Sequence, residues 1–247
     1  MNRLGVVTVV KNAFSVFFQN FATAFFIALI CGGLGSVLVT LGGQAFADQS
    51  DMKGQSLLVV SQLFQILLAT IWGGIVGSWA APAQIYLWVA HVKGRTASIY
   101  DAVNYGLNRF SRVLPAHFKA LAIVQAGNIV VVPGVLFGLQ YAFVDAIATL
   151  DSQETSPLKR SSRLTSGRRG TIFRTMCVFL VWWLPYQFLL VYMAQSTNLL
   201  YSFGAGVIDH MVLILIDLCM VQFYLNLFQK QPEVSEGQSA SVEPAAG

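Results

Sequence analysis

Three long runs without a charged side chain constrain this chain more than any other feature. They cover residues 12–47, 54–90 and 175–208 and consist mostly of apolar side chains. A helix of about 20 consecutive apolar residues is long enough to cross the hydrocarbon core of a bilayer. The sequence therefore predicts an all-α protein, a polytopic transmembrane helical bundle.

The composition agrees with a chain that lies mostly in or against lipid. The 247 residues are 55% hydrophobic and 11% charged, and the mean hydropathy is +0.63. The residues left over fall short of the ~100 that a separate soluble catalytic domain usually needs. The net charge of +4 comes from short basic patches beside apolar segments. Such patches are typical of orientation signals and contacts with anionic headgroups, not of nucleic-acid binding.

The breaks between apolar segments predict six spans in a single domain, residues 1–228. The predicted spans are 21–46, 57–81, 114–132, 135–150, 172–192 and 205–228. The first is too long for the ~7–15-residue apolar core of a cleaved secretory signal, so we prefer a retained span. The polar residues 229–247 are predicted to form a disordered cytoplasmic tail.

Two prolines are expected to shape these spans. The pair Pro133-Gly134 marks a turn, which we place between spans three and four. The apolar run of span two continues to Ala90, which is longer than a perpendicular crossing of ~30 Å requires. We expect Pro82 to kink this helix.

Three shorter segments are predicted to form interfacial amphipathic helices, at 3–19, 96–109 and 157–166. The last has the strongest end signals: Ser156 suits the N-cap, Pro157 the first helical position and Gly167 the position after the last turn.

Small residues cluster in the first two spans, around 32–36 and 73–78. Small side chains allow neighbouring helices to approach closely in a membrane. We expect the two clusters to pack against each other, or to mediate self-association into a homo-oligomer.

The distribution of positive charge predicts the orientation. All but one of the 15 Lys and Arg residues lie on one side of the six-span arrangement, and the exception is Lys53. Because positive charge stays in the cytoplasm, both termini are predicted to be cytoplasmic. A single crossing over 113–150 would place the basic segment 151–174 outside, so the charge pattern also supports the reversal at Pro133-Gly134.

One region resembles a known family. After Pro133-Gly134 and a short aromatic-rich span, the basic helix ends in Leu164-Thr165-Ser166-Gly167-Arg168-Arg169. This pattern, within 133–174, resembles a superfamily of bacterial six-span proteins that includes the glycerophosphodiester phosphodiesterase membrane domain and relatives of unknown function. The resemblance implies a six-span fold in the bacterial cytoplasmic (inner) membrane. It implies little chemistry, because the phosphodiesterase activity belongs to a separate barrel domain that this chain lacks.

Asp217 is the leading candidate for a functional residue, because it lies near the middle of predicted span six. An ionisable group at that depth costs ~3 kcal/mol by insertion scales, so we expect it to be paired, hydrated or protonated. His210 and Tyr224 stand seven residues to either side, which places all three on one helix face. The simpler interpretation is a hydrogen-bonded carboxyl that holds helices together. The more specific interpretation is a proton- or cation-linked pathway through the bundle.

Asp145 and a set of basic residues form a second group of candidates. Asp145 lies inside predicted span four near its cytoplasmic end, where we expect Arg163, Arg168 or Arg169 to pair with it. That pairing would be either a structural salt bridge or the latch of a gate. The predicted contacts to anionic lipid, at ~1 kcal/mol each, are Lys159, Arg160, Arg163, Arg168 and Arg169.

Catalytic and metal-binding patterns are missing from the sequence. The three histidines are scattered, and the three cysteines lie in apolar segments without metal-ligand spacing. An intramembrane enzyme would need two convergent ionisable groups, whereas His210 and Asp217 stand ~10 Å apart along their helix. We expect no catalytic residue, cofactor, metal site or nucleic-acid partner.

The expected function is accordingly that of a non-enzymatic membrane protein. A scaffold, an assembly factor or a lipid-organising protein would have membrane lipids, a second copy or another membrane protein as partners. The alternative is a transporter or channel for a small molecule or ion with Asp217 in its pathway.

Overall fold

The computed structural model describes residues 5–49, 55–128, 130, 132–151, 153–179, 181 and 198–228. Over these residues the regular elements are all helices, with no strand. Four described segments are long and apolar enough to cross a membrane: Phe21–Phe46, Val59–Val92, Val132–Leu150 and Leu199–Asn226. The predicted helical membrane bundle is confirmed at this level. The predicted tail, 229–247, lies outside the described residues.

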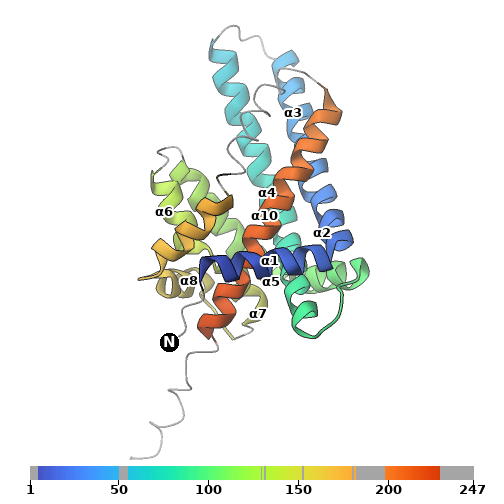
Figure 1. Ribbon diagram of the computed structural model, residues 1–247. Coiled ribbons are helices and arrows are strands. Elements are labelled where there is room, and N and C mark those ends of the chain that lie inside the picture. Colours follow the sequence, from blue (N-terminus) through green and yellow to red (C-terminus); the bar gives the residue numbers. More distant parts are fainter. Residues whose placement is uncertain are drawn as a thin grey trace, which may run out of the picture.

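The first and last of these segments match predicted spans 21–46 and 205–228. The first is built from α2 (Phe21–Ala28), a π-helical stretch η1 (Leu29–Leu34) and α3 (Gly35–Gln49). The last is α10 (Leu199–Phe228), which packs against η1 and α3. Figure 1 shows α10 rising beside α3 and leaning across α4.

The second span is longer than predicted. Helix α4 (Gln55–Val92) continues through Pro82 instead of ending near 81. Its C-terminal part is buried within the protein, with Gln84 only 2% and Leu87 0% exposed. Packing on both sides supports this part of the helix, which explains why it extends beyond the length that a bilayer requires.

The third predicted span is wrong as a separate, full-length crossing. Residues expected to form a surface helix at 96–109 and a span at 114–132 instead form one helix, α5 (Ile99–Asn128). The apolar half of α5, from Val113 onward, reaches ~24 Å at 1.5 Å per residue, which is less than the ~30 Å of a hydrocarbon core. The fifth predicted span, 172–192, lies largely outside the described residues.

The predicted reversal after α5 is confirmed, although its residues differ. The chain turns back between Asn128 and α6 (Val132–Tyr141), and the two helices pack as a hairpin. Pro133 and Gly134 lie in the first turn of α6, where a proline's missing N–H costs no hydrogen bond. In Figure 1 the tip of this hairpin stops short of the α3–α4 end of the molecule.

The fourth predicted span, 135–150, is interrupted. After α6 a turn at 142–143 precedes a short helix, α7 (Val144–Leu150). The interruption is held by the side chain of Ser161, which accepts a hydrogen bond from the Phe143 N–H (3.2 Å) and donates one to the Gln140 carbonyl (2.9 Å).

Ser161 belongs to α8 (Pro157–Thr165), which ends close to the predicted position. Gly167 follows with a φ of +75°, a conformation that favours glycine. Ser156 occupies the N-cap position, but its side chain makes no capping hydrogen bond.

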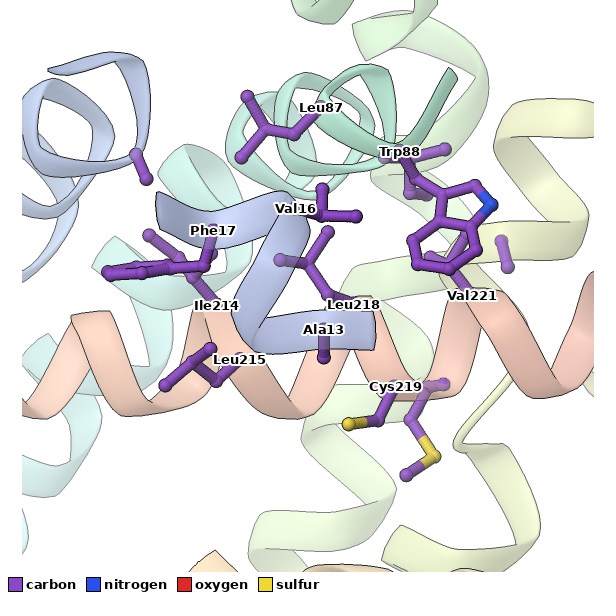
Figure 2. Packing of buried hydrophobic residues seen from close by; sticks show 14 of the residues in the cluster. Ala13, Val16, Phe17, Leu87, Trp88, Ile214, Leu215, Leu218, Cys219 and Val221 are labelled. Atoms are coloured by element: carbon purple, nitrogen blue, oxygen red, sulfur yellow. The ribbon is translucent and has the colours of Figure 1, made fainter. Parts of the chain in front are cut away.

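The N-terminal helix α1 (Val6–Gln19) is a helix as predicted, yet its buried face contacts protein. Figures 1 and 2 show it lying across α10. The residues that it buries are Val9, Ala13, Val16 and Phe17. Its other face exposes the apolar side chains of Val7, Phe14 and Phe18. Helix α1 is therefore apolar on two sides, one for the bundle and one for its surroundings.

A buried asparagine fixes the corner between α1 and α2. The Asn20 side chain accepts a hydrogen bond from the Ala97 N–H (2.6 Å) and donates one to the Val16 carbonyl (2.8 Å). The Thr23 hydroxyl donates to the Ala97 carbonyl (2.7 Å). These bonds join the corner to the loop that precedes α5.

The two clusters of small residues do not pack against each other as expected. In the first cluster, a Cβ on Gly32 would collide with the backbone of Gly206 in α10. In the second, a Cβ on Gly77 would lie 2.6 Å from His117 Nε2 in α5. The first cluster therefore packs on α10, with Gly35 also against Trp72 of α4, and the second packs on α5.

Candidate functional site

The central feature of the site is a pair of ionisable side chains from α5 and α7. His117 Nδ1 lies 2.9 Å from each carboxylate oxygen of Asp145, and His117 Nε2 lies 3.2 Å from the Gly73 carbonyl oxygen. Each ring nitrogen thus has an acceptor, which is the hydrogen-bonding pattern of a protonated imidazolium. The side chains of His117 and Asp145 are 18% and 33% exposed.

Local structure explains how the pair meets. His117 and Asp145 lie at similar separations from the reversal near Val130, so the hairpin brings them to the same level. Gly77 of α4 leaves the space that the imidazole occupies. Asp145 is in the first turn of α7, where a negative charge is favoured by the helix dipole.

Asp217 of α10 joins this pair from a third helix. Its carboxyl group is within range of electrostatic interaction with both His117 and Asp145. We call these three residues, His117, Asp145 and Asp217, the central cluster. Asp217 was expected to be paired, hydrated or protonated, and the ionisable groups near it belong to α5 and α7.

The three residues predicted to share one face of α10 enter different environments. His210 Nε2 lies 3.1 Å from the side-chain amide nitrogen of Gln84 in α4. Tyr224, 1% exposed, packs its ring against Phe143 with ring centres 6.3 Å apart. Only Asp217 belongs to the central cluster.

A cavity of about 380 Å³ lies between the first span, α4 and α10. Asp209 and His210 contribute ionisable groups to its wall, and Ser36, Thr40 and Ser202 contribute hydroxyl groups. These residues belong to the N-terminal half of α10 and to α3.

The expected pairing of Asp145 with Arg163, Arg168 or Arg169 is wrong, because His117 occupies the carboxylate. Arg168 instead donates to the Leu164 carbonyl of its own helix end (3.3 Å).

Arg160, one of the five predicted lipid contacts, points back into the protein. It forms ion pairs with Asp151 and with Glu154, the latter at 3.2 Å. The Ser156 backbone N–H, followed by Arg160, lowers the pKa of Glu154 below its usual value. Lys159, Arg163 and Arg168 are exposed, whereas Arg169 is half-buried.

Sequence reasoning missed His117 and Gln84. His117 was counted among scattered histidines, although its position relative to the chain reversal signalled its pairing with Asp145. Gln84 gives no sequence signal beyond its place in an apolar run. Within the described part of the chain, no three His, Cys, Asp or Glu side chains are placed to hold a metal ion.

Comparison with models of known families, with curated proteins and with solved structures finds no match to this chain. The chemistry of the residues above is therefore the basis for assigning a function.

Proposed function

We propose that this protein provides a proton- or cation-linked pathway for a small solute through a helical bundle. The observation that carries the proposal is the central cluster, in which His117, Asp145 and Asp217 converge from three helices. Ionisable groups are costly in a membrane, face the bundle interior and typically mark ion or substrate routes.

The chemistry of the cluster suits proton transfer. Histidine gains and loses a proton near neutral pH, and its two nitrogens allow a proton to enter on one side and leave on the other. The Asp145 carboxylate lies within hydrogen-bonding distance of His117 Nδ1, and Asp217 adds a second carboxyl group nearby. On α10, the cavity with Asp209 and His210 precedes the cluster by about two helical turns.

The proposal includes the predicted orientation. We place the chain in the bacterial cytoplasmic membrane with both termini in the cytoplasm, as the charge bias and the resemblance of 133–174 imply. The α5–α6 hairpin enters from the cytoplasmic side and returns to it. Because both ends of the hairpin lie on the cytoplasmic side, the basic segment 151–174 that follows it is also cytoplasmic, however deeply the hairpin enters the membrane.

Proton flux into proteoliposomes tests this function. A pH gradient would be imposed, and acidification would be followed with a trapped pH-sensitive dye. Asp217→Asn keeps the shape of the side chain and removes its charge, and we expect it to reduce flux at least about tenfold. Asp101→Asn, at an exposed position of α5, should leave flux unchanged. Wild-type flux equal to that of empty liposomes, or equal flux in Asp217→Asn, would contradict the proposal.

Exposed basic side chains favour a second candidate function, the organisation of anionic lipids. Lys159, Arg163 and Arg168 are exposed on and beside α8, and each basic group near an anionic surface contributes ~1 kcal/mol. Native mass spectrometry of wild type and of the triple Gln variant, with phosphatidylglycerol and cardiolipin, tests it. Equal lipid retention by the two proteins would exclude this role for the patch.

A further inference from the structure

The cavity beside α10 has the chemistry of a binding site, and it is separate from the central cluster. Among the described residues that line it, Asp209 is the only one with a formal charge at neutral pH. Two aromatic side chains, Trp72 and Tyr201, also line the wall. A carboxylate and aromatic rings, with no lysine or arginine among the described lining residues, favour a cationic ligand over an anionic one.

The remaining lining residues indicate the kind of cation. Ser36, Thr40 and Ser202 offer hydroxyl groups that can donate or accept hydrogen bonds, and the Thr40 hydroxyl donates to Ser202 Oγ (3.1 Å). The volume of about 380 Å³ lies at the small end of the ~300–1,000 Å³ range of ligand pockets. Because the wall mixes hydroxyl, aromatic and small apolar surface, it suits an organic cation better than a bare metal ion.

The wall of the cavity is held in place before any ligand binds. The Trp72 indole N–H donates to the Cys31 carbonyl (2.9 Å) within η1. Trp72 lines both this cavity and the apolar groove between α3 and α4. A π-helical turn is rare and often occurs at functional sites. A fixed wall reduces the entropic cost of binding.

We propose that this cavity binds a small organic cation that carries an ammonium group, with Asp209 as its counter-ion. Trp72 and Tyr201 contact the apolar substituents on the nitrogen, and the hydroxyl residues bind a polar group on the ligand. The site deepens the proposed function by naming the solute class. It rests on that function only for the claim that the bound cation is carried, because equilibrium binding does not require flux.

Calorimetric titration of the purified full-length protein tests the site. The probe is choline, and the control ligand is 3,3-dimethyl-1-butanol, which has the same shape without the charge. We expect wild type to bind choline at least about tenfold more tightly than the neutral analogue, a difference of about 1.4 kcal/mol. Acetate should not bind.

Three variants locate the binding. Asp209→Asn should weaken choline binding at least about tenfold, and Ala205→Leu should abolish it by filling the cavity. Ala122→Leu, the same substitution at an exposed position of α5, should bind like wild type, which controls for folding and detergent behaviour. Asp217→Asn should retain choline binding even where flux is lost.

Several results would overturn the site. They are failure of wild type to bind choline, equal affinity for the neutral analogue, or undiminished binding by both Asp209→Asn and Ala205→Leu. A wild type that binds choline but moves no protons would overturn the proposed pathway and leave the binding site intact. Proton flux without choline binding would do the reverse.

Discussion

His117 shows how one side chain can link three helices. Its imidazole contacts the Asp145 carboxylate on α7 and the Gly73 carbonyl on α4, and it lies within electrostatic range of Asp217 on α10. A charge-assisted hydrogen bond is stronger than a neutral one and shields two ionisable groups at once. The pair should therefore support the bundle in addition to any role in transport.

Asp145→Asn tests that structural contribution. The variant keeps the size of the side chain but loses the charge that His117 requires, so we expect a loss of about 1.5 kcal/mol in the free energy of unfolding. Denaturant titration of the detergent-solubilised protein measures it, with Asp101→Asn as the exposed control. Equal stability of Asp145→Asn and wild type would show that the pair contributes nothing to the bundle.

The lowered pKa of Glu154 predicts that the stability of the start of α8 depends on pH. Because the Ser156 N–H and Arg160 lower its pKa in the folded protein, its ionised form stabilises the fold above the ordinary glutamate pKa, and this contribution is lost as the pH falls through the lowered value. Amide hydrogen exchange of residues 160–165 in α8 should show weaker protection in Glu154→Gln than in wild type at about pH 6. The two proteins should converge once the pH falls below the lowered pKa of Glu154. A difference that does not change with pH would contradict this assignment.

At the residue level, sequence reasoning found some members of the site and not others. Asp217 was identifiable because a charge in an apolar run is conspicuous. The neighbouring His117–Asp145 pair was not, because its hydrogen bond depends on where the α5–α6 hairpin turns and on the space at Gly77. The arginines expected beside Asp145 are opposite charges close to it in sequence, but proximity in sequence did not decide the pairing.

At the level of elements, the segment from Leu164 to Arg169 has local structural reasons for its residues. Leu164 is buried, and the Thr165 hydroxyl donates to the Gln140 carbonyl (3.3 Å). Gly167 adopts a positive φ, and Arg168 caps the end of α8 through the Leu164 carbonyl. Leu164 and Thr165 pack α8 against the turn between α6 and α7, and Gly167 and Arg168 end the helix. The segment therefore has a structural role.

The close contact between η1 and α10 can be tested directly by mutation. We expect Gly206→Leu to cost about 1–3 kcal/mol of unfolding free energy, because the new side chain would collide with the backbone of Gly32. Gly204→Leu is a matched control on the same helix, since nothing lies within 4 Å of a Cβ there. Equal unfolding midpoints for the two variants would argue against the observed crossing.

Element boundaries were less predictable than the elements. The end signals of α8 are local, so they predicted its limits well. The change from polar to apolar residues within 99–128 carried no break, because a helix can continue while its environment changes from surface to core, even through Pro115. Hydropathy alone therefore divided one helix into two elements.

At the scale of the whole molecule, charge bias and shape make a joint prediction about topology. Single cysteines would be introduced into a variant without native cysteines and labelled in cells and in inverted vesicles with a membrane-impermeant maleimide. We expect Leu200→Cys to react from outside and Arg163→Cys from the cytoplasmic side.

The hairpin tip adds a third position to that experiment. Val130→Cys should react poorly from both sides, because the apolar half of α5 is too short to reach the outer surface. Labelling of Arg163→Cys from outside would reverse the orientation. Strong labelling of Val130→Cys from outside would show that the hairpin crosses fully.

Proton flux in a double variant tests the central claim most directly, namely that His117 and Asp217 act in one centre. His117→Gln, Asp217→Asn and the double variant would be compared in the same proteoliposome assay, with reconstituted protein amounts matched. Residues that act as a unit have non-additive effects, so the account predicts that the double variant is no slower than the slower single variant. A double variant whose loss equals the product of the two single losses would contradict the claim.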